Sequence, residues 1–241
     1  MEGFPKISRM GERSILIQFD SEISENTLRK VLFYKNRLER KLSEEKLQII
    51  NTYNSILISY ERTIEDAYSA FLTINEVLSE ANILKKDSGK VYRLPVCYSE
   101  EFGPDLHVIS KRNNLAVQEI IRLHSAQNYL VYFIGFLPGF LYLGGLDQKL
   151  HIPRKESPRQ TVEKGSVGIA GSQTGIYPKS SPGGWQLIGR SPVDLFNPKQ
   201  VPPCEISPGD QVVFEPVSEM EYFQIERAVQ KGAYSLKFDR K

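Results

Sequence analysis

The sequence predicts an α+β protein of two domains, and three observations lead to this prediction. Over the first 85 or so residues, apolar segments of strand character alternate with segments of helical periodicity. Further along, glycine and proline separate many short apolar runs, a pattern typical of a β-barrel or sandwich. A polar segment without periodicity, residues 85–90, lies between the two regions. We therefore expect a small α/β domain over residues 1–88 and a β-rich domain over residues 89–241.

The N-terminal region has a defined order of expected elements. Ser24 is expected to cap a helix over residues 25–43, and Thr63 a second helix, because apolar residues follow both at helical spacing. Four apolar segments of strand character are expected to form strands: residues 14–19, 47–53, 55–60 and 91–98. The resulting order, β-α-β-β-α-β, is that of a ferredoxin-like domain.

The C-terminal region is expected to be built of short strands with one helix. The helix should begin near Asn113 or Asn114 and end near Ser125. Three of the short apolar runs expected to form strands are residues 166–170, 185–188 and 211–214.

The composition argues against some classes of protein. Thirty-one Lys and Arg against 29 Asp and Glu give a formal charge of +2, too weak a bias for a nucleic-acid-binding protein. Cys97 and Cys204 fit no metal or redox motif, which indicates a reducing compartment. The first residues lack the apolar core of a signal peptide, so we expect a cytoplasmic protein.

Residues 125–146 are the only segment that resembles a membrane span. They carry no charged residue and are long enough to cross a bilayer. They also contain Pro138 and four glycines, which suit buried strands and turns better. We therefore expect no membrane span.

His124 is the candidate catalytic residue. It shares one face of the predicted helix with Ile120 and Ile121. A histidine in this position is as often a core residue satisfied by one hydrogen bond as a functional group. In the functional alternative it projects from the helix end toward the Gly-rich turns. His107 and His151 have no companion at metal-ligand spacing, so no metal site is expected.

Two arginines form a candidate anion site, because Arg154 and Arg159 each follow a proline. Proline restricts the local backbone, so the two guanidinium groups could be held at a fixed separation. Arginine suits bidentate recognition of a carboxylate or phosphate. The alternative, an exposed loop with ordinary salt bridges, is slightly favoured by the motif alone.

Other motifs give weaker signals. Residues 165–175 are rich in glycine but match no nucleotide-binding pattern, so their glycines more often allow close backbone approach. Trp185 is either a core anchor or the wall of a pocket. Asp105 and Glu163 are possible acid–base groups, although no pattern pairs them, and no nucleophile elbow or activated cysteine is found.

A series of longer motifs resembles one family. They include PVCY at 95–98, GPDL at 103–106, His124 with Tyr129, and GFLPGFLYLGGL at 135–146. The series continues in the same order at residues 153–154, 158–159, 165–171, 173–178 and 181–190. The chain thereby resembles the 5-oxoprolinase B-subunit family, also described as KipI-like or allophanate hydrolase subunit 1. The match runs from about residue 95 to 214, whereas the first 90 residues agree only in length and character.

The resemblance implies a fold, an activity and partners. The fold would be a C-terminal cyclophilin-like β-barrel behind the smaller α/β domain. The activity would be cleavage of 5-oxoproline to glutamate at the expense of ATP, carried out with the 5-oxoprolinase A-subunit, and with a KipA-like C-subunit. The resemblance does not say which component of the complex binds ATP. Some family members are described instead as inhibitors of a sporulation histidine kinase, and a docking role on its dimerisation domain is the alternative. A biotin-dependent carboxyltransferase role is remote, because no carrier domain is present.

The same resemblance suggests where substrate binds. His124 would hydrogen-bond to substrate or carry a proton. Arg154 and Arg159 would hold the substrate carboxylate or the transferring phosphoryl group. The expected substrate- or anion-binding residues are Arg154, Arg159, Gln173, Tyr129 and Trp185.

Overall fold

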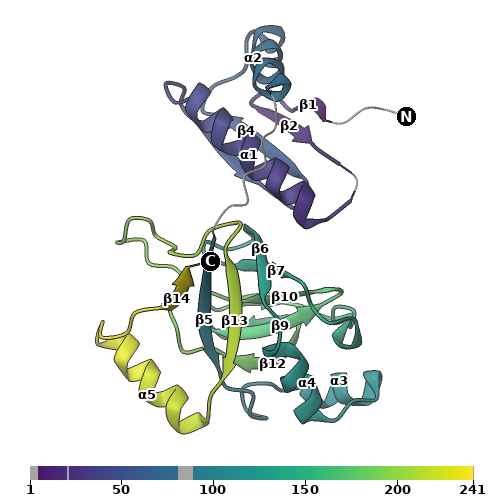
Figure 1. Cartoon of the computed structure of the whole chain (residues 1–241), viewed down its shortest axis with the longest axis vertical. Coiled ribbons are helices and arrows are strands. Elements are labelled where there is room, and N and C mark those ends of the chain that lie inside the picture. The colour runs from purple at the N-terminus through teal and green to yellow at the C-terminus, as the bar shows by residue number, and fades with distance from the viewer. Residues whose placement is uncertain (1–4, 21, 81–88, 241) are drawn as a thin grey trace. The chain divides into compact units, whose positions relative to one another are not determined.

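The computed structural model describes residues 5–20, 22–80 and 89–240 (Figure 1). The chain divides into two compact units, Met1–Asp87 and Ser88–Lys241. Most of the predicted linker, residues 85–90, lies outside the described residues.

The N-terminal unit is a four-stranded antiparallel sheet with two helices on one face. Its strands lie in the order β1-β2-β4-β3. The register pairs Ile15 with Ile58 and Ile17 with Ile56, and all four side chains are buried in one apolar layer with residues of both helices. This period-two alternation gives the sheet one buried face. The elements are β1 (Lys6–Met10), β2 (Ser14–Gln18), α1 (Glu25–Lys41), β3 (Leu47–Asn51), β4 (Ser55–Tyr60) and α2 (Ala67–Ser79).

The predicted ferredoxin-like order is wrong at its last strand. β4 pairs antiparallel with both β2 and β3, as a split β-α-β unit requires. The strand expected to complete this sheet is instead β5 (Lys90–Val96), which pairs with β13 (Gln211–Pro216) in the other unit. β1 occupies the position beside β2. The sequence analysis missed β1, which forms a local hairpin through a turn that contains Gly11 at a φ of +68°.

The helix caps explain where the two N-terminal helices begin. Ser24 caps α1 as predicted, because its side chain accepts a hydrogen bond from the Thr27 amide. The second predicted cap is wrong. Asp66, not Thr63, caps α2, and its Oδ1 accepts from the Ser69 amide at 3.0 Å.

The C-terminal unit contains an eight-stranded sheet, in the order β12-β9-β10-β7-β6-β13-β5-β14, and a two-stranded sheet of β11 and β8 (Figure 1). Its strands after β5 are β6 (Tyr129–Ile134), β7 (Leu141–Gly144), β8 (Arg159–Val162), β9 (Ser166–Ala170), β10 (Gln173–Ile176), β11 (Ser181–Gly183), β12 (Gln186–Arg190), β13 (Gln211–Pro216) and β14 (Lys237–Arg240). Its helices are α3 (Leu106–Asn113), α4 (Val117–Ser125), the short η1 (Gln148–Leu150) and α5 (Glu219–Gln230).

The predicted β-barrel is not closed. The two end strands of the large sheet, β12 and β14, do not pair with each other in the part of the chain that the structure describes. A single isolated bridge joins Cys97, just after β5, to Arg190 of β12 through two backbone hydrogen bonds of 2.9 Å. The sheet therefore curls until its ends approach at one point, without a continuous ladder there.

The predicted helix corresponds to α4, which ends at Ser125 as expected but is capped at Ala116 instead of Asn113 or Asn114, and the preceding helix α3 was not predicted. α3 ends at Asn113, and Asn114 takes a left-handed conformation with a φ of 52°. Both α3 and α4 contribute to the main core beneath the large sheet. Residues 125–146 form β6, β7 and their connections, and no helix in the described ranges is long and apolar enough to cross a membrane.

Candidate functional site

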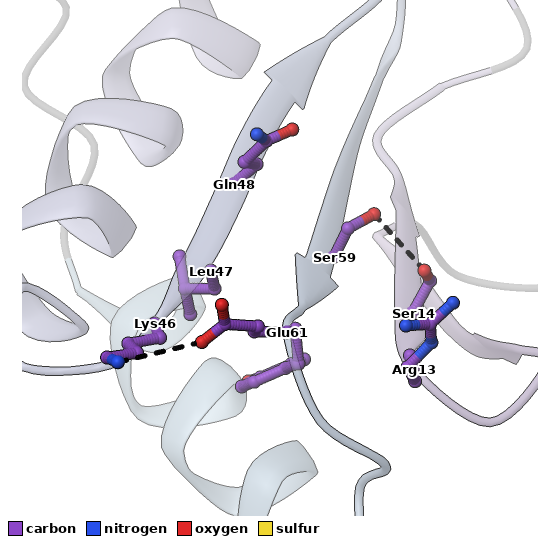
Figure 2. Close-up of a pocket in the computed structure, with 8 residues that line it drawn as sticks. Arg13, Ser14, Lys46, Leu47, Gln48, Ser59 and Glu61 are labelled. Carbon is purple, nitrogen blue, oxygen red and sulfur yellow. Dashed lines mark hydrogen bonds and ion pairs between the residues drawn. The ribbon is translucent and has the colours of Figure 1, made fainter.

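The N-terminal unit carries one open pocket of about 600 Å³ at the ends of β2, β3 and β4. Figure 2 shows Ser14 of β2 and Ser59 of β4 pointing toward each other from neighbouring strands at its wall, and their hydroxyl oxygens lie 3.1 Å apart. Lys46 and Glu61 form an exposed pair at 3.8 Å. The lining residues are Arg13, Ser14, Lys46, Leu47, Gln48, Ser59, Tyr60 and Glu61. None of the residues that the sequence analysis singled out lies in this pocket.

The C-terminal unit carries the stronger candidate, a layer of aromatic side chains that we call the aromatic face: Phe140, Tyr142, Tyr177 and Trp185. The ring centroids of Phe140 lie 5.5 Å from Trp185 and 5.1 Å from Tyr177, both near-perpendicular. Tyr142 lies 6.0 Å from Trp185 and is half-buried, whereas the other three are buried. Such edge-to-face pairs fix ring orientations beyond simple burial.

Two glycines of the Gly-rich segment make room for this layer. Tyr142, Gly175, Gly168 and Leu187 form a cross-strand row over β7, β10, β9 and β12, on the side of the sheet away from the main core. A Cβ at Gly175 would lie 2.7 Å from the Leu141 carbonyl oxygen and 3.1 Å from the Trp185 ring. A Cβ at Gly168 would lie 3.0 Å from Trp185 Cβ. These glycines serve close packing of the indole rather than a phosphate cradle.

Arg154 lies over this layer, with its guanidinium carbon 5.9 Å from the Trp185 ring centroid. Its side chain is exposed, and it has no ion-pair partner within residues 5–20, 22–80 and 89–240. Burial raises the pKa of Tyr142 and of Tyr177, and the charge of Arg154 acts in the opposite direction on both. A cation that lies on an aromatic wall and keeps its hydrogen-bond donors free is suited to bind an anion.

Arg159 has a different position from the one expected. Its Nη2 donates to both carboxylate oxygens of Asp105, at 2.7 and 2.8 Å, and its Nη1 donates to the Trp185 carbonyl at 3.4 Å. Asp105 is 3% exposed, so this is a largely buried ion pair. Arg159 was expected to bind an anion together with Arg154, but in the structure its guanidinium is bonded to Asp105 and to the Trp185 carbonyl.

His124 is fully buried, so the functional alternative, a proton carrier that faces the Gly-rich turns, does not fit its surroundings. Its Nδ1 lies 2.8 Å from the Tyr98 hydroxyl and its Nε2 lies 2.9 Å from Thr174 Oγ1. Thr174 donates its own proton to the Gly168 carbonyl at 3.0 Å, so His124 Nε2–H must donate to Thr174 and Nδ1 must accept from Tyr98. Burial lowers the pKa of His124 to about 3. The core alternative that the sequence left open describes this residue.

Tyr129 and Gln173 lie in different surroundings. Tyr129 is buried with His124, and its hydroxyl donates to the His124 carbonyl at 2.8 Å, so it does not reach the aromatic face. Gln173 is half-buried and pairs in register with Ala170, which belongs to the aromatic cluster. Paired residues of neighbouring strands point to the same side, so Gln173 borders this face.

The sequence analysis missed the loop that carries Phe136. This side chain is 62% exposed although it is apolar, and its φ of +65° is rare for a residue with a large side chain. Its ring meets Phe140 edge-on, with centroids 5.7 Å apart. Strain and apolar exposure at one residue beside a candidate site are typical of a functional loop.

Among the described residues, no three His, Cys, Asp or Glu side chains converge as a group that could hold a metal ion.

Comparison with known proteins agrees with the resemblance seen in the motifs. Residues 5–206 match the family described as carboxyltransferase domain, subdomain C and D. The chain is 36% identical over 232 residues to the 5-oxoprolinase B-subunit of Bacillus subtilis (strain 168), which covers 90% of this chain and 95% of that protein. It is 35% identical over 212 residues to the 5-oxoprolinase B-subunit of Escherichia coli O157:H7, which covers 87% of this chain and 95% of that protein. The similarity to the 5-oxoprolinase B-subunit family is thereby confirmed.

Solved structures agree at the level of the fold. The crystal structure of TTHA0988 superimposes with a TM-score of 0.74 at 32% identity and covers 86% of this chain, which spans only 40% of that one. A conserved uncharacterized protein, PH0987 from Pyrococcus horikoshii, is 40% identical, with a TM-score of 0.54, and is covered in full. Kluyveromyces lactis urea carboxylase gives a TM-score of 0.80 at 20% identity, which shows the shared fold.

We predict that His124 remains a neutral Nε2–H tautomer from pH 8 to about pH 5. Its folded-state pKa of about 3 lies below the ordinary value of about 6.5. Long-range nitrogen–proton correlation spectra of the imidazole rings provide the measurement, with exposed His107 and His151 as internal comparisons. The sign of the pH effect follows. Above about pH 6.5 the ring is neutral in both the folded and the unfolded chain. As the pH falls toward the folded-state pKa, only the unfolded chain binds the proton, so the free energy of unfolding decreases. A His124 ring that titrates near pH 6 would contradict the assignment.

We predict that Gly175→Ala displaces the indole of Trp185. The new Cβ would lie 3.1 Å from the indole, and it cannot retreat because a backbone oxygen lies 2.7 Å away. Trp185 is the only tryptophan, so its fluorescence emission should shift to longer wavelength as water reaches the ring. Gly184→Ala is the matched control, since the nearest atom to a Cβ there lies 3.7 Å away. Equal emission spectra for both variants would show that the glycine is not needed for packing.

Proposed function

The chain belongs to the carboxyltransferase domain family, subdomain C and D, and from this premise we propose that it is one component of an ATP-dependent 5-oxoprolinase. Support comes from two relatives named as the B-subunit of 5-oxoprolinase. The alignment with this chain covers 95% of the length of each. We further propose that it acts with the A-subunit of that enzyme, and with a KipA-like C-subunit. The proposed reaction converts 5-oxoproline, ATP and water to glutamate, ADP and phosphate.

The observation that carries the proposal is the exposed guanidinium of Arg154, which lies over the ring of Trp185 and has no ion-pair partner among the residues that the structure describes. 5-Oxoproline is a flat five-membered lactam with a carboxylate on the ring. In the proposed complex, the carboxylate accepts two hydrogen bonds from Arg154 at the edge of the aromatic face, where Tyr142 is the member that is only half-buried. Gln173, at the border of this face, is placed to contact the lactam.

The chemistry explains why more than one protein is needed. An unstrained amide is a poor electrophile, and phosphorylation of the lactam oxygen creates a leaving group. Water then adds to the same carbon, and the ring C–N bond breaks to give a free amine and γ-glutamyl phosphate. A second water hydrolyses this acyl phosphate to glutamate and phosphate. In this proposal the chain binds and orients the lactam, because no described carboxylate or histidine at the aromatic face is free to act as a general base.

ATP is a substrate of the proposed complex, and the glycine-rich segment 165–175 of this chain does not suit a phosphate cradle. The glycines at 168 and 175 are covered by Trp185, and the segment runs from strand to strand without opening a helix. No step of the proposed reaction therefore places ATP on this chain.

The histidine-kinase alternative gains no specific support. Mixed charges on α1 pair within the helix, as in Lys35 with Glu39 at 2.6 Å and Arg29 with Glu25. Such pairs are typical of a solvated helix face.

We predict that Arg154→Lys raises the KM of the reconstituted enzyme for 5-oxoproline by about 10-fold or more, with a smaller effect on kcat. Lysine keeps the charge but loses the planar pair of donors that a carboxylate needs. Steady-state kinetics of the complex is the measurement, and Arg112→Lys on the exposed side of α3 is the matched control. An unchanged KM for Arg154→Lys would remove this residue from the substrate site.

We also predict that the isolated chain has no 5-oxoprolinase activity and that activity needs both proposed partners. The measurement is 5-oxoproline-dependent phosphate release by each of the three proteins singly and in every combination. Turnover by this chain alone, with contaminating partners excluded, would refute the assignment. So would full activity of the two partners without it.

A further inference from the structure

Asp105 is the buried carboxylate on which two other segments of the C-terminal unit, β12 and residues 155–159, converge. It lies just before α3 and is 3% exposed. Its Oδ2 accepts from the Leu187 amide at 2.6 Å, and both oxygens accept from Arg159. The ammonium of Lys155 lies 3.6 Å from Oδ1. Asp105 also donates its own amide to the Leu187 carbonyl at 2.9 Å, so backbone and side chain both fix it to β12.

The charges around this carboxylate are unequal. Two cations, Lys155 and Arg159, share one anion, and both are largely buried, with side chains 30% and 24% exposed. Removing the carboxylate charge would leave two like charges close together at a partly desolvated point. The segment between them, residues 155–159, would then lose the interaction that draws it onto β12.

Arg154 lies next to this clamped segment, and its flanking residues are held on both sides. The Lys155 amide donates to the Gly184 carbonyl at 2.7 Å, while the Lys155 side chain reaches Asp105. On the other side, Gln186 Nε2 donates to the Pro153 carbonyl at 3.3 Å. The backbone at Arg154 is therefore fixed, although its guanidinium pairs with no carboxylate in the described part of the chain.

We infer that Asp105 is a positioning residue, which holds the segment 153–159 so that Arg154 stays over Trp185 and is ready to receive a carboxylate. The inference rests on the proposed substrate-binding role of Arg154. Asp105 itself does not touch substrate in this arrangement. It acts through Lys155 and Arg159, which explains why two adjacent proline–arginine motifs have different roles.

The only tryptophan of the chain reports on this arrangement without any enzymatic assay. A guanidinium charge beside an indole changes its emission maximum, so Arg154→Ala should shift the emission of Trp185. Asp105→Asn should shift it in the same direction. In the double variant, Asp105→Asn should add no further shift, because the Arg154 guanidinium that it positions is already gone. Asp194→Asn breaks the exposed pair with Lys164 and is the matched control, expected to leave the emission unchanged.

Thermal melts establish that each variant is folded before its spectrum is compared. If Asp105→Asn does not fold, Lys155→Met replaces it, since this change removes one arm of the clamp and keeps the carboxylate; a smaller shift in the same direction is expected. An unchanged emission, or a shift of the same size with and without Arg154, would overturn the inference. In the reconstituted enzyme the supporting result is a raised KM with kcat retained. If that enzyme shows no 5-oxoprolinase activity at all, the proposed function fails while the fluorescence result still stands or falls by itself.

Discussion

The aromatic face depends on one packing constraint, the contact of the Trp185 indole with a sheet surface that has no side chains at two positions. Gly168 and Gly175 leave the backbone of β9 and β10 bare, and Phe140 and Tyr177 then close around the ring. A buried indole of this size needs a flat, well-matched support, because interiors are packed as densely as crystals. The position of Arg154 follows from it, since that guanidinium lies on the ring that the glycines admit.

Periodicity predicted the N-terminal elements well and their assembly less well. Alternating isoleucines in β2 and β4 marked strands with one buried face, and Ser24 marked the start of α1. The run that became β5 is buried along most of its second half, Leu94 to Val96, and such a strand carries no sign of which sheet it joins. Its parallel pairing with β13, more than 100 residues away, is a long-range contact that no local pattern reports.

At the site, too, local patterns are visible in the sequence whereas long-range contacts are not. The proline before Arg154 and the turn before Trp185 are local signals, and both residues were singled out from them. Arg159 was also expected to bind an anion, but the carboxylate with which it pairs lies 54 positions away in the chain. The two alternatives for His124 were decided by Tyr98 and Thr174, at separations of 26 and 50 residues. Sequence can nominate a polar residue, but whether its hydrogen-bonding capacity is already used depends on tertiary neighbours.

The hydrogen-bonded chain from Tyr98 through His124 and Thr174 to Gly168 also has a consequence for strand alignment. Successive side chains of β10 point to opposite sides of the sheet, so Thr174 faces the histidine while Gly175 faces the indole. A slip of β10 by one residue would turn a side chain with a Cβ toward Trp185 and leave a buried histidine without its acceptor. Burial makes that second fault costly, because an unsatisfied polar group in the core has no water to replace its partner. The hydrogen bonds on one side of the sheet thus fix the register of β10, and this register keeps Gly175 against Trp185 on the other side.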